Sequence, residues 1–469
     1  MPQVPTKGSA VPATLEIAHL AHAMPALSSE NGLMVRNLFR DGLGALLAGM
    51  RHHTVRLLAE HVRELGCAPR SPVYGWNFST APQEAAFVLG TATHALDFEP
   101  MCLPPTHAVS PVLGSLLALA HADPRDRDGG RFLRAFTAGI QLQVDLRRSA
   151  EAADREAVRH GRHFPFQRQG FHPPGTVGPM GSALAASIWL GLEPRQTAVA
   201  LGIAASRASG IAGNIGTMTK ATHCGHAARV GVESALLAQR GMTASTATFE
   251  EPAGWSEVFG GESFDIASVG DGMRSLRCFS DPGFAFKRWP VHTAMQIAIC
   301  AALKAYDGAR PPSQVTIHAP VFRYCDRPFP RDGDDARFSF QYNVAIGLLD
   351  GAVGLDSHSE ERLRCDDVQT LLRRTKLVLD PDITPSFDGM SVHVTTDDGR
   401  RGASDGWPGH WRYPATEEDH ARKFDACARR LMPPEQAQSL RSLVDGIEGD
   451  GGLETLLQGL AASEAPLAR

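Results

Sequence analysis

The stretch that most constrains the fold opens with G-F-H-P-P-G-T-V-G-P (residues 170–179), a turn-rich segment that presents His172. Alanine-rich runs follow, and each predicts a helix that ends near a glycine: 180–192, 197–211 and 227–239. Before the third run comes N-I-G-T-M-T-K-A-T-H-C-G-H (214–226), which carries Lys220. We therefore expect plain helices whose connecting loops hold the polar groups, an arrangement typical of a site built on a scaffold.

Lys220 is conspicuous because the chain uses arginine for almost every cation. Only six of its 46 Lys and Arg residues are lysine. An ammonium offers three movable donors and a pKa that burial can lower, whereas a guanidinium is fixed in charge and shape. Lys220 is therefore a candidate anchor for an anionic ligand, and the alternative interpretation is a solvated loop lysine.

The composition excludes several classes of protein. With 469 residues, of which 43% are hydrophobic, the chain can bury one large core or form two domains. Its net charge of −5 and its lack of a basic stripe argue against nucleic acid as a partner. No apolar run reaches the roughly 18–20 residues of a membrane span, and the first residues show no secretory signal. We expect a cytoplasmic protein without a membrane segment.

Metal binding is not expected either. The eight cysteines are scattered without a C-x-x-C pair, which is typical of a reducing compartment and argues against a thiolate-bound zinc or iron–sulfur cluster. His223 and His226 are three positions apart, with no carboxylate nearby to complete a metal site.

The pattern along the chain predicts a mainly α fold with an α+β second domain. Helical spacing dominates the first half, over 15–27, 32–50, 54–65, 82–97, 111–122 and 131–149. The charged segment 151–169 is either a continuation of the last helix or mobile. Strand patterns occur only later, at 313–321, 376–380 and 390–402, among predicted helices at 293–306, 338–349 and 368–374. We divide the chain into a large helical domain (1–275 and 405–469) and a smaller α+β lid domain (276–404).

Asp97 and His107 flank one loop between two predicted helices. The first helix ends near Asp97 because Pro100 cannot continue it, and M-C-L-P-P-T-H-A-V-S (101–110) then presents His107. A carboxylate and an imidazole on one loop form an acid/base arrangement. The alternative is an aspartate that caps a helix and a histidine at the surface.

Further candidates lie where the chain enters the second predicted domain. K-R-W-P-V-H (287–292) brings Lys287, Arg288 and His292 into one segment, which could also be a charged interdomain linker. Tyr324 follows a predicted strand in an aromatic and cationic loop, where a structural hydrogen bond is the alternative role. This set of groups would suit a small polycarboxylate substrate. The set comprises imidazoles, lysines, a tyrosine and a lone carboxylate, and its cations would neutralise the charges of the substrate.

Longer motifs resemble the MmgE/PrpD family. The resemblance rests on G-F-H-P-P-G-T-V-G-P-M-G-S-A-L-A-A (170–186) and on G-T-M-T-K-A-T-H-C-G-H-A-A-R-V-G-V (216–232). It extends through H-A-L-D-F (94–98), F-A-F-K-R-W-P-V-H (284–292) and D-A-R-F-S-F-Q-Y-N-V-A (335–345), and so covers nearly the whole chain. Within the family, R-Y-C-D-R-P-F-P (323–330) and G-H-W-R-Y-P (409–414) are most similar to the cis-aconitate decarboxylase branch.

The resemblance implies a helical domain with an α+β lid, a site between them, a homodimer, and catalysis without a metal or an organic cofactor. It implies a catalytic set of Asp97, His107, His172, Lys220, His292 and Tyr324. We also expect substrate contacts by His172, Lys220, His107, Thr106, Lys287, Arg288 and His223. Lys220, His172 and His107 would hold carboxylates, His292 or Tyr324 would protonate carbon, and Asp97 would orient an imidazole.

The implied reaction is decarboxylation of cis-aconitate to itaconate. Dehydration of a 2-methylcitrate-like hydroxy acid, or epimerisation of a related dicarboxylate, would use the same groups, and a non-catalytic carboxylate-binding protein is the alternative of a different class. Two departures from the family pattern lie on one loop. The usual D-F-D-D reads Asp97-Phe98-Glu99-Pro100, and the usual H-P reads His107-Ala108. They leave the choice of substrate open.

Overall fold

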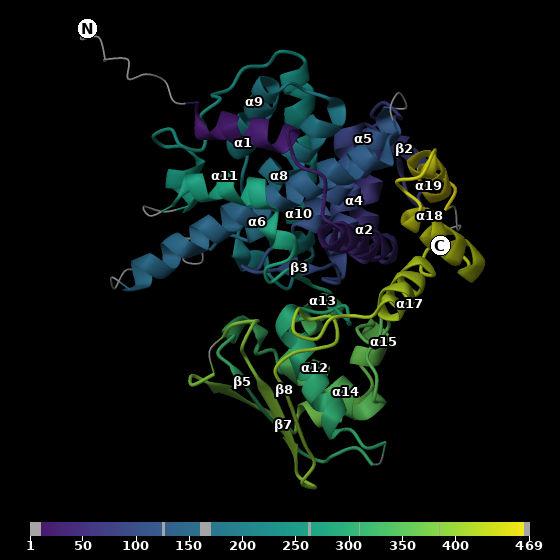
Figure 1. Cartoon of the computed structure of the whole chain (residues 1–469). Helices are drawn as coiled ribbons and strands as arrows, with labels where there is room; N and C mark the ends of the chain where they lie inside the picture. Colours follow the sequence, from purple (N-terminus) through teal and green to yellow (C-terminus); the bar gives the residue numbers. More distant parts are fainter. Residues whose placement is uncertain are drawn as a thin grey trace.

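The computed structural model describes residues 11–123, 127–159, 170–260, 264–308, 310–383 and 385–463. It has a large helical body and a smaller body that contains a β-sheet, with α17 (Glu417–Ala428) beside their junction (Figure 1). The predicted fold class, mainly α with an α+β part, is confirmed. The charged segment does continue the preceding helix as far as Arg159, whereas residues 160–169 lie outside the described residues.

The helical body is built from the first half of the chain and from its end. Its helices before the second body are α1 (Ala13–His22), α2 (Ser29–Gly49), α3 (His53–Glu64), α4 (Pro82–Ala95), α5 (Val109–Ala122), α6 (Gly129–Arg159), α8 (Pro173–Leu190), α9 (Pro194–Ala205), α10 (Met218–Gln239) and α11 (Ile266–Ser275). A short hairpin, β1 (Ser71–Val73) and β2 (Phe78–Thr80), joins α3 to α4. The last helices, α17, α18 (Pro434–Asp445) and α19 (Gly452–Ala461), share the same hydrophobic core.

Glycines let three of the central helices approach closely. A Cβ atom on Gly225 of α10 would lie 2.2 Å from the carbonyl oxygen of Phe87 in α4. A Cβ atom on Gly114 of α5 would lie 2.6 Å from the backbone nitrogen of Gly90 in α4. Only glycine fits such contacts, so the small residues that make these helices look plain in sequence determine how α4, α5 and α10 cross.

Two helices begin seven or more residues before their predicted starts. α8 starts at Pro173, because proline is tolerated in the first turn, where no amide donor is needed. α10 starts at Met218, so the prediction that Lys220 and His223 lie on a loop was wrong. Packing of its small side chains against α4 and α8 outweighs the low helix propensity of threonine and glycine. α1 also ends at His22 rather than at 27.

The smaller body places helices on one mixed sheet. Its helices are α12 (Thr293–Ala305), α13 (Gly333–Ala336), α14 (Phe340–Asp350), α15 (Glu360–Leu363) and α16 (Asp366–Leu372). The sheet has the order β6-β5-β7-β8, formed by Thr375–Asp380, Val315–Pro320, Val392–Thr396 and Arg401–Ser404. β5 runs parallel to β6 and antiparallel to β7, while α12 packs against β7 and β8. The predicted D-G turn joins β7 to β8, and a second hydrophobic core lies between helices and sheet.

A two-residue strand pair joins the loop after α4 to the entrance of the smaller body. β3 (Met101–Cys102) pairs antiparallel with β4 (Phe284–Ala285), with Met101 opposite Ala285. Such short strands leave no pattern in the sequence, and this pairing was not predicted. The predicted domain boundaries stay a prediction. In the described part of the chain, no helix combines the length and the apolar character that crossing a bilayer requires.

Candidate active site

Asp97 lies at the centre of the candidate site and binds two lysines from different parts of the chain. Its carboxylate accepts from Nζ of Lys220 at 2.5 Å and from Nζ of Lys287, which also donates to the Asp97 carbonyl at 2.8 Å. The backbone of Asp97 is left-handed, with φ of 50°, a conformation that aspartate tolerates better than most residues. Burial favours the neutral acid, but the two ammoniums outweigh it and hold the pKa of Asp97 well below its usual value.

Glu99, on the same loop, contacts two imidazoles with one oxygen. Its Oε1 lies 2.5 Å from Nδ1 of His94 on α4 and 2.9 Å from Nδ1 of His107. Ser110 of α5 donates to the same oxygen at 3.1 Å. Glu99 therefore lies closer to both imidazoles than Asp97 does, whose carboxylate lies 3.9 Å from His107 Nε2. Asp97 itself holds the two lysines, and its role in orienting an imidazole stays a prediction.

The N-terminal ends of α8 and α10 supply two more imidazoles. His172 precedes Pro173, and its Nδ1 lies 3.0 Å from Nδ1 of His223 in α10. The rings of His94, His107 and His172 lie near one another, with centroids 4.3 Å apart for the first two. Burial lowers the pKa of His94 and His223 to about 4 and that of His172 well below its usual value, so these rings are neutral at neutral pH.

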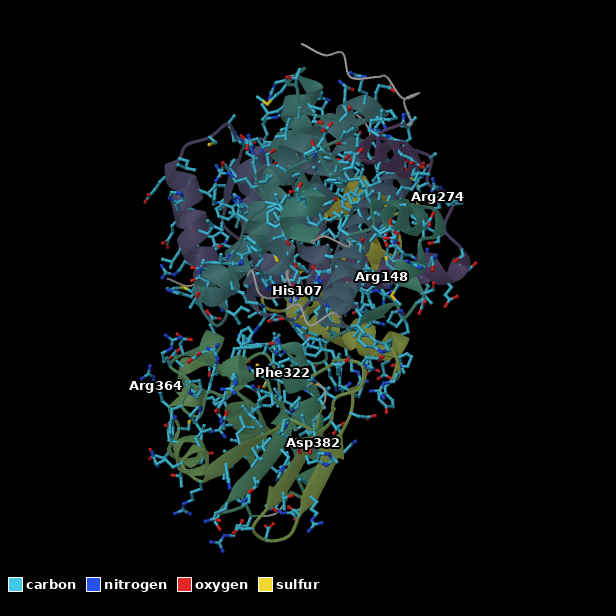
Figure 2. All side chains as sticks on the ribbon, turned by 90° about the vertical axis from the view of Figure 1, so that its left-hand side faces the viewer. His107, Arg148, Arg274, Phe322, Arg364 and Asp382 are labelled. Carbon is cyan, nitrogen blue, oxygen red and sulfur yellow. The ribbon has the colours of Figure 1, made fainter. Side chains whose placement is uncertain are left out.

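His292 and Tyr324 form the side of the site that belongs to the smaller body. His292 precedes α12, and its Nε2 lies 3.3 Å from Oη of Tyr324 in the short helix Arg323–Cys325. Burial lowers the pKa of His292 to about 3. Tyr324 is 40% exposed and so lies at the rim. Figure 2 shows His107 at the edge of the helical body and Phe322 at the facing edge of the other.

The structure separates one predicted residue from this group. Arg288 points its guanidinium at Asp419 of α17, at 3.3 Å, and its side chain is 41% exposed. It therefore lies outside the buried set, although it adjoins Lys287 in sequence. Thr106 is buried beside His107, and its hydroxyl has no hydrogen-bond partner in the described part of the structure.

A small cavity of about 20 Å³ lies among these groups, between the two bodies. It is lined by His52, Thr54, His94, Ala95, Asp97, Gly216, Thr217, Met218, Lys220, Ala221, Asp334, Arg337 and Phe338. His52 Nε2 lies 3.0 Å from Asp334 Oδ1, across the junction. Arg337 is buried and donates to the carbonyl of Pro290 at 2.5 Å. A volume of this size holds about one water molecule.

Histidines and carboxylates close enough to hold a metal ion occur here. Ligand atoms of His94, His107 and His172 lie within 4.8 Å of one another, and a second such group combines His94 and His107 with Asp97 and Glu99. However, two ammoniums already bind Asp97, and their positive charge opposes a divalent cation. The two lysines therefore argue against a divalent cation at Asp97.

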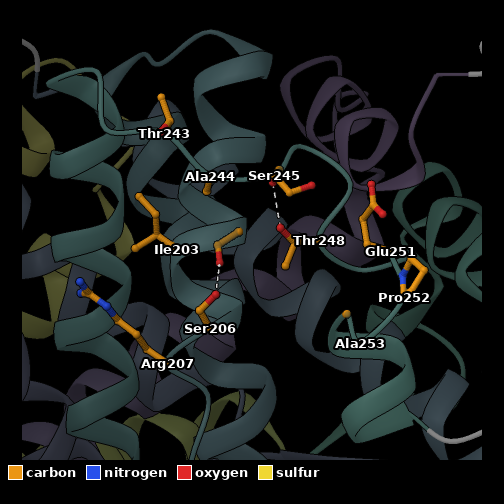
Figure 3. Close-up of a pocket in the computed structure, with 12 residues that line it drawn as sticks. Ile203, Ser206, Arg207, Thr243, Ala244, Ser245, Thr248, Glu251, Pro252 and Ala253 are labelled. Atoms are coloured by element: carbon orange, nitrogen blue, oxygen red, sulfur yellow. Dashed lines mark hydrogen bonds between the residues drawn. The ribbon is translucent and has the colours of Figure 1, made fainter. Parts of the chain in front are cut away.

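A larger pocket lies elsewhere and lacks such chemistry. It has a volume of about 480 Å³ and lies between the end of α9 and the segment 243–254 (Figure 3). The hydroxyls of Ser206 and Thr248 donate to backbone carbonyls within this region, and Arg207 pairs with Glu233. No group of imidazoles or buried carboxylates lines this pocket in the described part of the chain.

Sequence reasoning missed His94, Glu99 and Lys423. Lys423 of α17 donates to Asp41 at 2.8 Å and to the carbonyls of Phe98 and Lys287 at 2.7 and 2.8 Å. The scarcity of lysine would have identified it, because it is one of the six. Glu99 was noted only as a departure from a motif.

Comparisons with known proteins identify the family of this chain. The MmgE/PrpD N-terminal domain model matches residues 16–267, and the MmgE/PrpD C-terminal domain model matches residues 289–448. Cis-aconitate decarboxylase of Homo sapiens is 32% identical over 452 residues, which cover 92% of this chain and 90% of that protein. Cis-aconitate decarboxylase of Mus musculus is 32% identical over 456 residues, which cover 93% and 90%. The chain therefore belongs to the MmgE/PrpD family.

Proposed function

We propose that this chain is a carbon–carbon lyase that decarboxylates cis-aconitate to itaconate. The observation that carries the proposal is the buried group of Asp97, Lys220 and Lys287 beside neutral imidazoles, between the two bodies. Two relatives of about one-third identity over most of both chains bear the name of this activity.

Chemically, the reaction removes carbon dioxide from a tricarboxylate and places a proton on carbon. Cationic and hydrogen-bonding groups, Lys220, His172 and His107, would hold the carboxylates that remain. The electron pair left by the broken carbon–carbon bond would delocalise into the conjugated acid. His292, whose imidazole contacts the Tyr324 hydroxyl, would with that tyrosine supply the proton to carbon.

A dehydratase acting on a 2-methylcitrate-like hydroxy acid is the second candidate. The neutral state of His94, His172 and His292 favours it, because a neutral imidazole can abstract a proton next to a carboxylate. The loop with Glu99 and Ala108, where the chain departs from the family pattern, would then select the substrate.

The test is to incubate the purified protein with cis-aconitate and a chelator and to follow products by proton NMR together with released carbon dioxide. Itaconate and carbon dioxide support the proposal. If cis-aconitate is unchanged but 2-methylcitrate loses water, the second candidate is correct. Exchange of a C–H proton with solvent and no other change would indicate an epimerase, and no reaction with any of these acids would indicate a binding protein.

A further inference from the structure

We infer that His94 takes up a proton when a polycarboxylate binds and then donates a hydrogen bond to one of its carboxylates, and that Glu99 is the residue that positions His94 for this. The inference rests on the proposed function only for the class of ligand. It adds His94 and Glu99 to the residues expected to hold the substrate.

His94 has one anchored nitrogen and one unused nitrogen. It is 1% exposed, and its Nδ1 is bound to Glu99. Its Nε2 is buried and has no hydrogen-bond partner within the described residues. His94 also lines the cavity that Asp97 and Lys220 line. Because an unpaired buried polar atom costs free energy, a ligand in this cavity would gain by supplying the missing partner.

Glu99 fixes which nitrogen of His94 is left without a partner. Its side chain is fully buried, and Oε1 is shared with His107 and Ser110. An imidazole that donates its Nδ1 proton to a carboxylate keeps the Nε2 lone pair on the other side. The same carboxylate stabilises the imidazolium once Nε2 gains a proton, as an aspartate does behind a catalytic histidine.

The charge balance explains why binding would bring a proton. The charged and titratable groups around His94 and its cavity come from several elements: Asp97 and Glu99 after α4, His107 before α5, His172 before α8, Lys220 and His223 on α10, Lys287 after β4, His52 before α3, and Asp334 and Arg337 at α13. The three carboxylates balance the two lysines and the arginine. A polycarboxylate would therefore add uncompensated negative charge to a buried site. A proton on Nε2 offsets part of that charge and supplies a donor.

The test is calorimetric titration of wild-type protein with tricarballylate, a saturated tricarboxylate, in buffers that differ in ionisation enthalpy. Burial holds the pKa of His94 at about 4 in the free protein, so the proton must come from solvent. We expect uptake of about one proton per ligand bound, and a Kd that rises about tenfold from about pH 7 to about pH 8.

Variants assign the proton to His94. We expect the proton uptake to disappear, and the Kd to become nearly independent of pH, in His94→Gln and in Glu99→Gln. In the second variant the glutamine side chain has the same shape as the glutamate that it replaces. His393→Gln, on the exposed side of β7, should keep the wild-type uptake. Thermal unfolding checks that each variant is folded, and Glu99→Gln decides alone if His94→Gln does not fold.

Two results would overturn the inference. One is tight binding of tricarballylate by the wild type without proton uptake, and the other is unchanged uptake in a folded His94→Gln or Glu99→Gln variant. Both leave the proposed decarboxylation standing. If no di- or tricarboxylate binds the wild type at all, the proposed function itself is wrong, and the inference fails with it.

Discussion

At the scale of single residues, Asp97 shares its carboxylate between Lys220 and Lys287, and all three are buried. Replacing Lys220 with methionine would leave Asp97 with one ammonium and remove a cation that faces the cavity. Breaking a buried charge pair costs about 3–5 kcal/mol. We expect Lys220→Met to lower kcat/KM for the substrate by at least about 10²-fold, measured by steady-state kinetics.

Lys376→Met is the matched control for this substitution. Lys376 is exposed on β6, so its removal should leave kcat/KM unchanged and alter stability by no more than about 0.5 kcal/mol. Wild-type kinetics in a folded Lys220→Met variant would remove this lysine from the site.

Much of the residue set could be predicted from sequence, but its pairing could not. The scarcity of lysine in this chain identified Lys220, and predicted positions on loops identified Asp97, His107 and His172. The contact between His94 and Glu99 has no signal of its own, because a histidine inside a plain helix is more often a structural residue. Arg288 is a case in which the sequence suggested a site residue that the structure places elsewhere. Its neighbour Lys287 binds Asp97 in the site, whereas Arg288 pairs with Asp419.

At the scale of elements, α17 ties the two segments that carry Asp97 and Lys287. Lys423 on this helix bonds the carbonyls of Phe98 and Lys287 and pairs with Asp41 of α2. We expect Lys423→Met to lower the unfolding temperature, by leaving Asp41 unpaired in the core, and to lower kcat roughly tenfold by releasing both segments. Thermal unfolding and steady-state kinetics measure the two effects.

A second substitution separates these effects. Adding Asp41→Asn to Lys423→Met removes the unpaired carboxylate, so stability should return in part while kcat stays low. Arg422→Met, on the exposed face of the same helix, should match the wild type in both measurements. Full recovery of kcat in the double variant would show that Lys423 acts only on stability.

The positions of the helices were easier to predict than the helix ends at which the candidate site residues lie. Alanine-rich spacing located α8, α9 and α10, but the first turns of α8 and α10 were read as loops because proline, glycine and threonine dominate there. Proline is compatible with the first turn of α8, and packing against α4 stabilises the first turn of α10. The pairing of β3 with β4, which brings the two halves of the site together, involves residues about 180 positions apart and could not be read from local pattern.

At the scale of the whole molecule, histidines with lowered pKa values link stability to pH. Among the described residues, burial, partial for several of them, lowers the pKa of ten histidines: His22, His94, His121, His172, His223, His226, His292, His358, His410 and His420. The unfolded chain protonates them near pH 6.5, and the folded chain does not. The stability that depends on their neutral state is therefore present above about pH 6.5 and is lost as the pH falls.

Among the described residues, two carboxyl groups act in the opposite direction. Burial raises the pKa of Asp41 to about 6 and that of Asp145 to about 7, so their contribution is present at low pH and is lost as the pH rises through these values. The ten histidines outnumber them. We expect the unfolding temperature, measured by calorimetry, to fall from about pH 7 to about pH 5; an unchanged or higher value at the lower pH would contradict this sign.

The arrangement of the two bodies also bears on access to the site. A cavity of about 20 Å³ cannot contain a tricarboxylate, so the proposed substrate would enter only if the bodies, or the loops between them, moved apart. The homodimer implied by the resemblance stays a prediction. Family membership, in contrast, could be recognised from the sequence alone, because its motifs are spread along nearly the whole chain.

The most direct test of the proposed chemistry is the ratio of itaconate to carbon dioxide formed from cis-aconitate, with Asp97→Asn measured beside the wild type. We expect equal amounts of the two products from the wild type. The variant should lose at least about 10²-fold in rate, because its neutral amide cannot hold the two lysines. Consumption of cis-aconitate without carbon dioxide, or an equal rate in a folded Asp97→Asn variant, would contradict decarboxylation at this site.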